Sequence, residues 1–394
     1  MSLLSIAEAQ ARTLALAAPL AEETVPLVVA AGRYAAADVI ALRTQPAADL
    51  SAMDGYAIRF GELPGPWVMI GESAAGAGLG RAIAPGETAR IFTGAPLPPG
   101  ADTVLVQEDA AREGDRVRLD GEGPPRARAH VRPKGSDFTG GHTLIRDGEL
   151  LTPARIALAA VGGHGVVAVR RKPRITLIST GDELVLPGEP TEGDRLPSSN
   201  APMLTALLGA LPVEVVDTGI VRDDVGAIAD AFTAARGADI IVTTGGASVG
   251  DRDLVRPALE RVGARLDFWK IAMKPGKPLM AGRLDDAVVV GLPGNPVSAY
   301  VTAVLFLLPL VRHLLGAGDP LPEIRPTTLL GPLPATAKRA EYPRATIGNE
   351  GVTPLAGQDS AALVALAACN GLIVRPSNAP PAEPGQVVNV LRIA

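Results

Sequence analysis

The stretch that decides the fold is AVVVGLPGNPVSAYVTAVLFLL, residues 287–308. A short apolar run typical of a buried strand is followed by a tight Leu-Pro-Gly-Asn sequence, and then by an apolar run long enough for a helix. The same succession recurs over residues 174–316, where strand patterns such as RITLIST and ADIIVTTGG alternate with helix patterns such as APMLTALLGA and DVGAIADAFTAARG. This alternation predicts a mostly parallel, doubly wound sheet with helices on both faces.

Ligands of such sheets bind at the carboxyl ends of the strands, and three of these ends carry unusual loops. The loops are STGDEL (179–184), TTGGASVGDRD (243–253) and GLPGNP (291–296). Asn295 is a candidate helix cap, as is Asn200 for an earlier helix, and Pro296 suits a first helical position. The free N–H groups at the start of the helix expected from Pro296 onward favour binding of an anion.

A second Pro-Gly pair lies in KPGKP, residues 274–278. Pro275 and Gly276 fit the central positions of a type II turn, which would bring the Cα atoms of Lys274 and Lys277 within about 7 Å. Two ammonium groups at that separation repel each other unless an anion lies between them. The alternative is a surface hairpin with two solvated lysines. Together with the backbone donors of GLPGNP, the two lysines suit phosphate or another oxyanion.

Composition limits the possible functions. A chain of 394 residues is expected to form two to four domains. Its net charge of −5 provides no overall field that would attract nucleic acid or an anionic membrane. The N-terminus lacks the basic segment of a signal peptide and fits a helix with Ser5 and Glu8 at capping-box spacing, so we expect a cytoplasmic protein. The single cysteine, Cys369, lies in an apolar segment and is expected to be buried and inert.

The most apolar segment is PVSAYVTAVLFLLPLVRHLLG, residues 296–316. Pro309, Arg312 and His313 interrupt it, so a buried helix is expected rather than a membrane span. Residues 1–173 have many short strand patterns, with a helix expected near 153–161, and the residues from about 319 onward again form short strands and turns.

Two other interpretations follow from short patterns. Residues Gly246–Gly250 match the serine hydrolase motif G-x-S-x-G, with Ser248 as the nucleophile, but the downstream histidine, His313, lies in a helix pattern. Acidic residues recur in polar loops, where each is either an ordinary turn residue or, if several converge, a ligand of Mg²⁺. These residues are Asp54, Glu108, Asp137, Asp182, Glu183, Asp251 and Asp253.

Six motifs occur together and in a fixed order: SAMDGYA (51–57), TGAPLPPGADTVLVQED (93–109), STGDEL, TTGGASVGDRD, KPGKP and GLPGNPVSA. In this combination the chain resembles the molybdopterin molybdenumtransferase family, which includes MoeA proteins and the E domain of gephyrin. The resemblance covers nearly the whole chain.

The resemblance implies a multidomain α/β plus β protein with four domains. Domain I comprises 1–44 and 136–172, domain II (β-rich) 45–135, domain III (α/β, similar to molybdopterin adenylyltransferase) 173–318, and domain IV (a small β-barrel-like domain) 319–394. It also implies a homodimer with a site formed by both subunits. The reaction inserts molybdate into the dithiolene of adenylylated molybdopterin and releases AMP, with Mg²⁺ required. Molybdopterin adenylyltransferase and molybdoenzymes are possible protein partners.

The resemblance also implies roles for individual residues. Lys274 and Lys277 would hold phosphate or molybdate and, with Asp54 and Asp253, carry the catalysis. Metal binding would fall to Asp54, Asp137, Asp182, Glu183 and Asp253. Contacts to the pterin dinucleotide would come from Thr93, Arg132, Thr180, Gly245, Gly246, Ser248, Pro293, Gly294, Asn295, Arg339 and Ser360.

One departure and two alternatives accompany this interpretation. The run VRPKGSD (131–137) contains Pro133 where the family commonly has a further basic residue. Glu341 and Arg344, with Arg339 and Ser360, match the cleft-facing pattern of the family's fourth domain, and the alternative is that they are ordinary surface residues. Adenylylation of molybdopterin is one alternative activity, and it would make the adenylylated pterin rather than consume it. The other alternative is a non-enzymatic scaffold of the kind formed by the gephyrin E domain.

Overall fold

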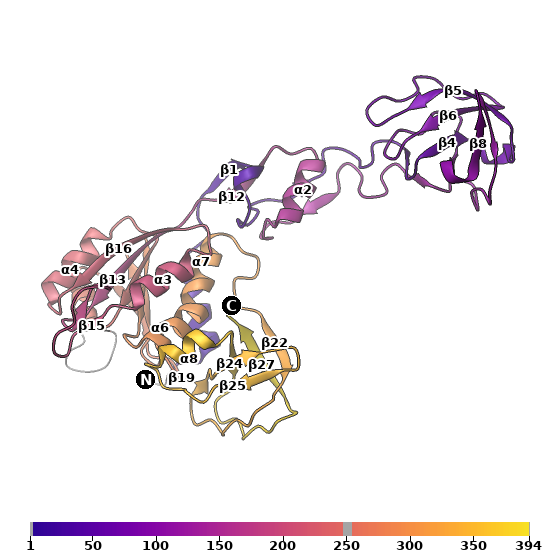
Figure 1. The fold of residues 1–394 in the computed structure, drawn as a ribbon. Helices are drawn as coiled ribbons and strands as arrows, with labels where there is room; N and C mark the ends of the chain where they lie inside the picture. Colours follow the sequence, from indigo (N-terminus) through magenta and orange to yellow (C-terminus); the bar gives the residue numbers. More distant parts are fainter. Residues whose placement is uncertain (1–2, 247–253, 394) are drawn as a thin grey trace.

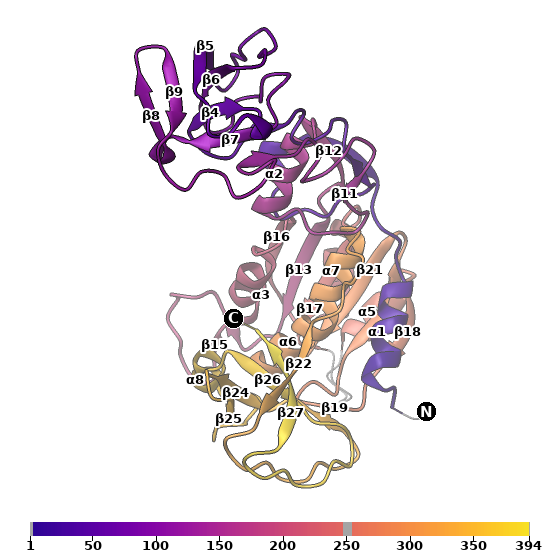
Figure 2. The ribbon, with the colours of Figure 1, turned by 90° about the vertical axis from the view of Figure 1, so that its right-hand side faces the viewer.

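The molecule is elongated, with a β-rich body at one end, a narrow middle part, and an α/β body with a second β body packed beside it at the other end (Figures 1 and 2). The structure is a computed structural model that describes residues 3–246 and 254–393. We call the terminal β-rich body domain II, the middle part domain I, the α/β body domain III and the C-terminal β body domain IV. The bounds predicted for these domains from the sequence stay a prediction.

Domain III is built on a six-stranded sheet with the order β16-β13-β17-β21-β20-β18. Strand β20 runs antiparallel to both neighbours, and β16, β13, β17 and β21 are parallel. The strands are β13 (Arg174–Thr180), β16 (Glu214–Val221), β17 (Ile240–Thr244), β18 (Arg265–Trp269), β20 (Met280–Leu284) and β21 (Ala287–Leu292). Short pairs outside this sheet are β14 (Leu184–Val185) with β15 (Leu196–Pro197), and β19 (Met273–Lys274) with β23 (Ala340–Glu341).

Helices cover both faces of this sheet, which confirms the predicted doubly wound fold. One core joins α3 (Asn200–Leu208), α6 (Pro296–Thr302), the π-helical turn η4 (Ala303–Leu307) and α7 (Leu308–Leu314) to side chains such as Leu177 and Val290. The other core joins α4 (Val225–Ala234) and α5 (Val255–Arg261) to Ile178 and Ile241.

The N-terminal helix α1 (Ile6–Ala15) packs on domain III. The Ser5 side chain accepts a hydrogen bond from the Glu8 N–H at 3.2 Å, so the predicted cap is confirmed. Ala9 is fully buried in the domain III core, and Gln10 Nε2 donates to the Leu305 carbonyl at 2.9 Å. Arg12 forms an ion pair with Asp267 of β18 at 2.7 Å. The helix therefore belongs structurally to the α/β body, although the sequence groups it with domain I.

The segment Pro296–Leu314 forms one long helix through α6, η4 and α7. It is long and apolar enough to cross a membrane, the one such helix within the described ranges, but 83% of its apolar window is buried inside the protein. That burial is the property of a core helix, as the sequence predicts.

Domain II contains a six-stranded sheet with the order β7-β4-β6-β5-β9-β8. Its strands are β4 (Gly55–Ile58), β5 (Trp67–Ser73), β6 (Glu87–Ile91), β7 (Thr103–Val106), β8 (Ala110–Glu113) and β9 (Arg116–Leu119), with the short pair β3 (Leu50–Ser51) and β10 (Val131–Arg132) beside them. The short 3-10 turns η2 (Phe60–Glu62) and η3 (Gln107–Asp109) connect strands.

Domains I and IV are small. Domain I comprises η1 (Leu27–Val29), the predicted helix α2 (Pro153–Val161), and two antiparallel pairs, β1 (Glu22–Pro26) with β12 (Val166–Arg170) and β2 (Val39–Ile40) with β11 (Thr143–Ile145). Domain IV has a sheet with the order β22-β27-β26-β24-β25 and one short helix, α8 (Leu363–Ala368). Its strands are β22 (Ile324–Thr328), β24 (Arg344–Ile347), β25 (Val352–Pro354), β26 (Gly371–Val374) and β27 (Val387–Arg392).

Asp49 ties three segments of domain II together. Its carboxylate accepts hydrogen bonds from the Lys134 N–H at 2.7 Å and from Arg128 at 2.8 Å, and its carbonyl accepts from the Leu97 N–H at 2.8 Å. The Lys134 N–H and then the Arg128 guanidinium hold the pKa of the Asp49 carboxyl below its usual range.

We predict that Asp49→Asn lowers the free energy of unfolding by about 1 kcal/mol at pH 7, because the amide accepts these hydrogen bonds more weakly. A depressed folded-state pKa contributes stability above the ordinary aspartate pKa of about 4 and loses it as the pH falls through the folded value. The difference in Tm between the variant and the parent should therefore shrink on acidification below pH 4. Asp120→Asn, at an exposed ion pair with Arg118 of 3.4 Å, is the control and should change Tm little. A pH-independent effect of Asp49→Asn would contradict the assignment.

Candidate active site

The register of the domain III sheet brings four loops to one edge. Ser179 pairs with Thr244, and Thr244 pairs with Leu292, so β13, β17 and β21 end at the same level. Met280 at the start of the antiparallel strand β20 pairs with Gly291. The segment before Met280 therefore leaves the sheet on the side where the other strands end. STGDEL, TTGG, GLPGNP and KPGK all lie at this edge.

Glycines allow these loops to touch one another. Gly245 has a φ of +90°, and a Cβ there would lie 2.5 Å from the Thr180 carbonyl oxygen. A Cβ on Gly246 would lie 2.5 Å from the Val255 side chain. The position of a Gly294 Cβ is 3.5 Å from the Gly245 Cα. Thr180, Gly245, Gly246 and Gly294 thus lie close together, and their role in ligand binding stays a prediction.

The KPGK loop differs from the predicted type II turn. Gly276 has the expected positive φ of +102°, but the Lys274–Pro275 peptide bond is cis, and the Ile271 N–H closes a wider loop by donating to the Lys277 carbonyl at 3.1 Å. A Cβ on Gly276 would lie 2.5 Å from Thr302 of α6, so the loop packs directly on that helix. Lys274 and Lys277 are both exposed at the edge.

Domain IV closes on this edge. Asn295 Nδ2 donates to Ser360 Oγ at 3.1 Å, and the Val297 N–H donates to the Ser360 carbonyl at 3.2 Å. Lys274 forms an ion pair with Glu341 at 3.6 Å through the pairing of β19 with β23, which also places Arg339 next to this loop. Helix α8 of domain IV lies beside α6 at this point (Figure 1).

Three side chains here differ from expectation. Asn295 occupies the N-cap position of α6 but makes no capping hydrogen bond, because its amide is directed to Ser360. Asn200, also expected as a cap, donates instead to the Gly294 carbonyl at 2.7 Å. The expectation that Arg344 faces the cleft is wrong, because Arg344 is only 1% exposed. Its guanidinium donates to the carbonyl of Gly357, in the loop that carries Ser360, at 2.6 Å.

Carboxylates follow β13 at the same edge. Asp182 and Glu183 are exposed, and Asp182 Oδ1 accepts a hydrogen bond from the Asp223 N–H at 3.1 Å. Asp223 follows the neighbouring strand β16 and was missed by the sequence analysis, since its segment has no distinctive motif. Ser248 and Asp253, predicted as a ligand contact and as a catalytic and metal residue, lie outside the described residues.

Domain II brings together a second group of predicted residues. Asp54 Oδ1 accepts hydrogen bonds from the Thr93 N–H at 2.7 Å and from the Thr93 hydroxyl at 2.8 Å. These two bonds, the N–H first, keep the pKa of the Asp54 carboxyl below its ordinary value. Arg132 lies in β10, where it pairs with Leu50 of β3, four residues before Asp54. Asp54, Thr93 and Arg132 therefore all belong to domain II.

The predicted residues therefore form two groups within one chain. β4, which follows Asp54, and β19, which contains Lys274, lie in bodies at opposite ends of the molecule (Figures 1 and 2). Asp137 lies with neither group, since its N–H donates to the Gln45 carbonyl where the chain passes between domains II and I.

The positions of the carboxylates decide how Mg²⁺ could be held. Over residues 3–246 and 254–393, no three Asp, Glu, His or Cys side chains form a cluster that would hold a metal by themselves. Mg²⁺ commonly binds to one or two carboxylates together with substrate phosphates. Asp182 and Glu183 are exposed at the same edge as the glycine loops and the two lysines, and they fit that mode of binding.

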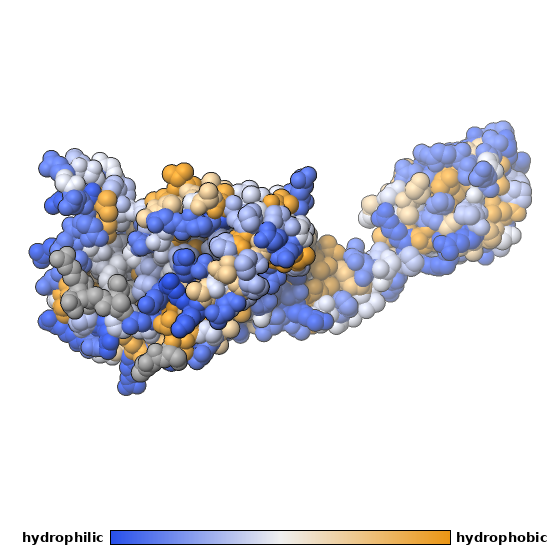
Figure 3. Space-filling model, turned by 90° about the horizontal axis from the view of Figure 1, so that it is seen from below, coloured by the Kyte–Doolittle hydropathy of each residue, from blue (hydrophilic) through white to orange (hydrophobic). Residues whose placement is uncertain are grey.

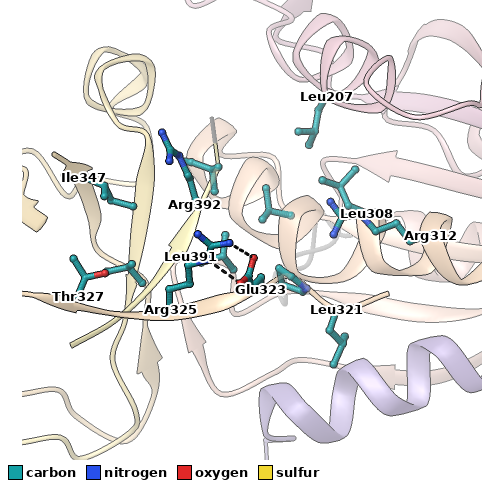
Figure 4. Close-up of a pocket in the computed structure, with 14 residues that line it drawn as sticks. Leu207, Leu308, Arg312, Leu321, Glu323, Arg325, Thr327, Ile347, Leu391 and Arg392 are labelled. Carbon is teal, nitrogen blue, oxygen red and sulfur yellow. Dashed lines mark hydrogen bonds and ion pairs between the residues drawn. The ribbon is translucent and has the colours of Figure 1, made fainter. Parts of the chain in front are cut away.

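A cavity of about 620 Å³ lies elsewhere, between domains III and IV (Figure 4). Leu207 and Leu308 line it from the helices, and Arg392 and Arg325 from domain IV, where Arg325 is paired with Glu323 at 2.7 Å. None of the predicted site residues is among its lining residues, so it is separate from the candidate active site.

The serine hydrolase interpretation fails on position. His313 lies near the end of α7, and its Nε2 is hydrogen-bonded to the Ala17 carbonyl at 2.9 Å. The long helix starts at the carboxyl edge of the sheet and runs away from it, so His313 is distant from the TTGG loop that precedes Ser248.

A doubly wound sheet with glycine loops, two exposed lysines and exposed carboxylates at its carboxyl edge is typical of α/β domains that bind a ligand at their strand ends. Three family models match the chain: the MoeA N-terminal region (domain I and II) over residues 4–163, a probable molybdopterin binding domain over 176–313, and the MoeA C-terminal region (domain IV) over 327–393.

Individual proteins agree with these matches. The chain is 38% identical over 301 residues to a molybdopterin molybdenumtransferase of Haemophilus influenzae, covering 76% of this chain and 74% of that one. It is 35% identical over 373 residues to molybdopterin molybdenumtransferase 2 of Mycobacterium tuberculosis, covering 90% and 91%. The structure of a molybdopterin biosynthesis moeA protein from Pyrococcus horikoshii matches with a TM-score of 0.86 at 26% identity, over 100% of both chains. The chain belongs to the molybdopterin molybdenumtransferase family, and it is a transferase.

The contact between the glycine loops gives a prediction. Gly245→Ala should lower the free energy of unfolding by about 2 kcal/mol or more, because the new Cβ both strains a positive φ and collides with the Thr180 carbonyl. Gly237→Ala is the matched control, since Gly237 has a φ of +93° with nothing within 4 Å of its Cβ position. Urea unfolding of both variants separates strain from collision. Equal destabilisation would show that the glycine loops tolerate a side chain and would contradict the described contact.

Proposed function

We propose that this chain is a molybdopterin molybdenumtransferase that inserts molybdate into the dithiolene of adenylylated molybdopterin and releases AMP. The observation that carries this proposal is the edge of the domain III sheet, where contacting backbone loops from three strands lie beside two exposed lysines. This combination suits a ligand with several phosphate oxygens and a second oxyanion.

Each part of the edge has a chemical task. The N–H groups of the contacting loops would bind phosphate, and Asn200 and Ser360 would keep the GLPGNP loop in place through Gly294 and Asn295. Lys274 and Lys277 would neutralise molybdate and the charge that develops as the phosphoanhydride breaks. Asp182 and Glu183 would hold Mg²⁺, which on binding would neutralise phosphate charge. The dithiolene sulfurs belong to the substrate, so Cys369, which is 8% exposed, need not take part.

We infer further that two copies of the chain form the site. Asp54 is half-buried and Thr93 exposed in domain II, and β4, which follows Asp54, lies in a body at the opposite end of the molecule from β19, which contains Lys274 (Figures 1 and 2). A homodimer in which domain II of one subunit meets the domain III edge of its partner would unite the two groups.

Domain I offers a surface for such a dimer. Val28 is 88% exposed, Leu42 67%, Val29 59% and Val166 50%. These residues lie on connected segments, because the Leu27 N–H donates to the Gly165 carbonyl and the Leu42 N–H to the Gly162 carbonyl. The narrow middle of the molecule also shows apolar surface in Figure 3. Contiguous exposed apolar surface of this kind marks an interface, and a second copy is the occupant that the shared site requires.

Several finer points belong to the same proposal. The enzyme would act in the cytoplasm, receive its adenylylated pterin from molybdopterin adenylyltransferase, and deliver the cofactor to molybdoenzymes. Adenylylation itself is the alternative activity, supported by the shared type of α/β domain, and the scaffold function is the non-enzymatic alternative.

The direct test is release of AMP by purified protein given adenylylated molybdopterin, Mg²⁺ and molybdate. We expect AMP only when molybdate is present, and Lys277→Ala should lower kcat about 100-fold, because a donor to the developing charge is lost. Lys172→Ala, an exposed lysine before β13 at the opposite edge of the sheet, is the control and should retain activity. Formation of adenylylated pterin from ATP without molybdate would favour the adenylyltransferase, and pterin binding with no AMP release would favour the scaffold.

A further inference from the structure

Arg90 lies beside the Asp54 loop in domain II and is held more tightly than an ordinary surface arginine. Its guanidinium lies over the ring of Tyr56, 5.2 Å from the centroid, and over the ring of Phe92 at 4.9 Å. Arg90 and Tyr56 are direct partners across β6 and β4, and Phe92 is two residues further on the same side. Stacking on two aromatic rings fixes the plane of the guanidinium.

The two ends of the guanidinium bond to groups on either side of Asp54. Nη1 donates to the carbonyl of Gly55, the residue directly after Asp54, at 2.9 Å. Nη2 donates to Gln107 Oε1 at 2.6 Å, and the Gln107 N–H in turn donates to the Asp54 carbonyl at 3.1 Å. Arg90 therefore connects β4, β6 and the turn after β7 around one residue.

We propose that Arg90 is a positioning residue for the transfer reaction, which fixes the Asp54–Thr93 pair through Gly55 and Gln107. This inference rests on the proposed function. Lysine cannot replace arginine here, since an ammonium has no planar fork to reach Gly55 and Gln107 while stacked between two rings. The main-chain direction at Asp54 sets where its carboxylate points, so loosening either neighbour displaces the group that Thr93 holds.

The test compares Arg90→Met and Arg90→Lys with the parent in the AMP-release assay. Both should lower kcat about 10- to 100-fold while the KM values for molybdate and the adenylylated pterin change less than about 3-fold, because geometry rather than binding is lost. Arg112→Met is the matched control, because Arg112 is an exposed arginine of β8 in the same sheet and its Nε donates to the Gly114 carbonyl at 2.8 Å. It should leave kcat unchanged.

Amide hydrogen exchange provides a readout that does not depend on activity. In Arg90→Met the Gln107 and Thr93 amides, which both donate to Asp54, should exchange about 10-fold faster or more. The amide of Ile58 in β4 should keep its protection from hydrogen exchange. If the exchange rates and kcat are unchanged, or if Arg90→Lys has full activity, Arg90 does not position Asp54. If kcat falls only in proportion to a general loss of Tm and protection, Arg90 is merely structural. If the parent releases no AMP but the amides still respond, the proposed function fails and the positioning contact stands.

Discussion

The shared level at which the domain III strands end is the constraint on which the rest of the structure depends. Parallel strands in register release their loops at one edge, and here the pairing of Ser179 with Thr244 and of Thr244 with Leu292 sets that level. The loops touch only because glycine occupies the points of contact, where the Gly245 Cα approaches both Thr180 and Gly294. A side chain at Gly245 would collide with Thr180 and one at Gly246 with Val255, whereas a Cβ at Gly294 would fit at 3.5 Å from the Gly245 Cα.

The same edge determines how domain IV is placed. Asn295 reaches Ser360 instead of capping its own helix, and Lys274 reaches Glu341 through a short strand pair. The buried Arg344 supports the segment that carries Ser360, with its pKa lowered by burial. Tyr342, between Glu341 and Arg344, is also buried, which raises its pKa to about 12 and keeps its hydroxyl neutral. These contacts attach domain IV to the edge of the domain III sheet.

The sequence predicts the local parts of this architecture well. The Ser5 cap, the helix at 153–161, the doubly wound sheet and the burial of Cys369 all follow from short-range patterns. The errors involve partners that are distant in sequence. Asn295 and Asn200 have the composition of caps, but their amides bond to residues 65 and 94 positions away. Arg344 is buried by the loop at residues 357–360, and no local sequence pattern links the two segments. The partners of Arg90 lie on other strands and turns, so its contacts appear only in the folded structure.

The central claim is that one active site is built from domain II of one subunit and the domain III edge of another. Mixed dimers test it most directly. Asp54→Ala and Lys277→Ala chains, each inactive alone, should recover AMP release when refolded or co-expressed together, because each heterodimer then has one site with both residues intact. With random pairing, half of the dimers would be mixed and each would have one of its two sites restored, so the activity should reach about a quarter of the parent value. If the mixture stays as inactive as the separate variants although heterodimers form, the site lies within a single chain and the account is contradicted.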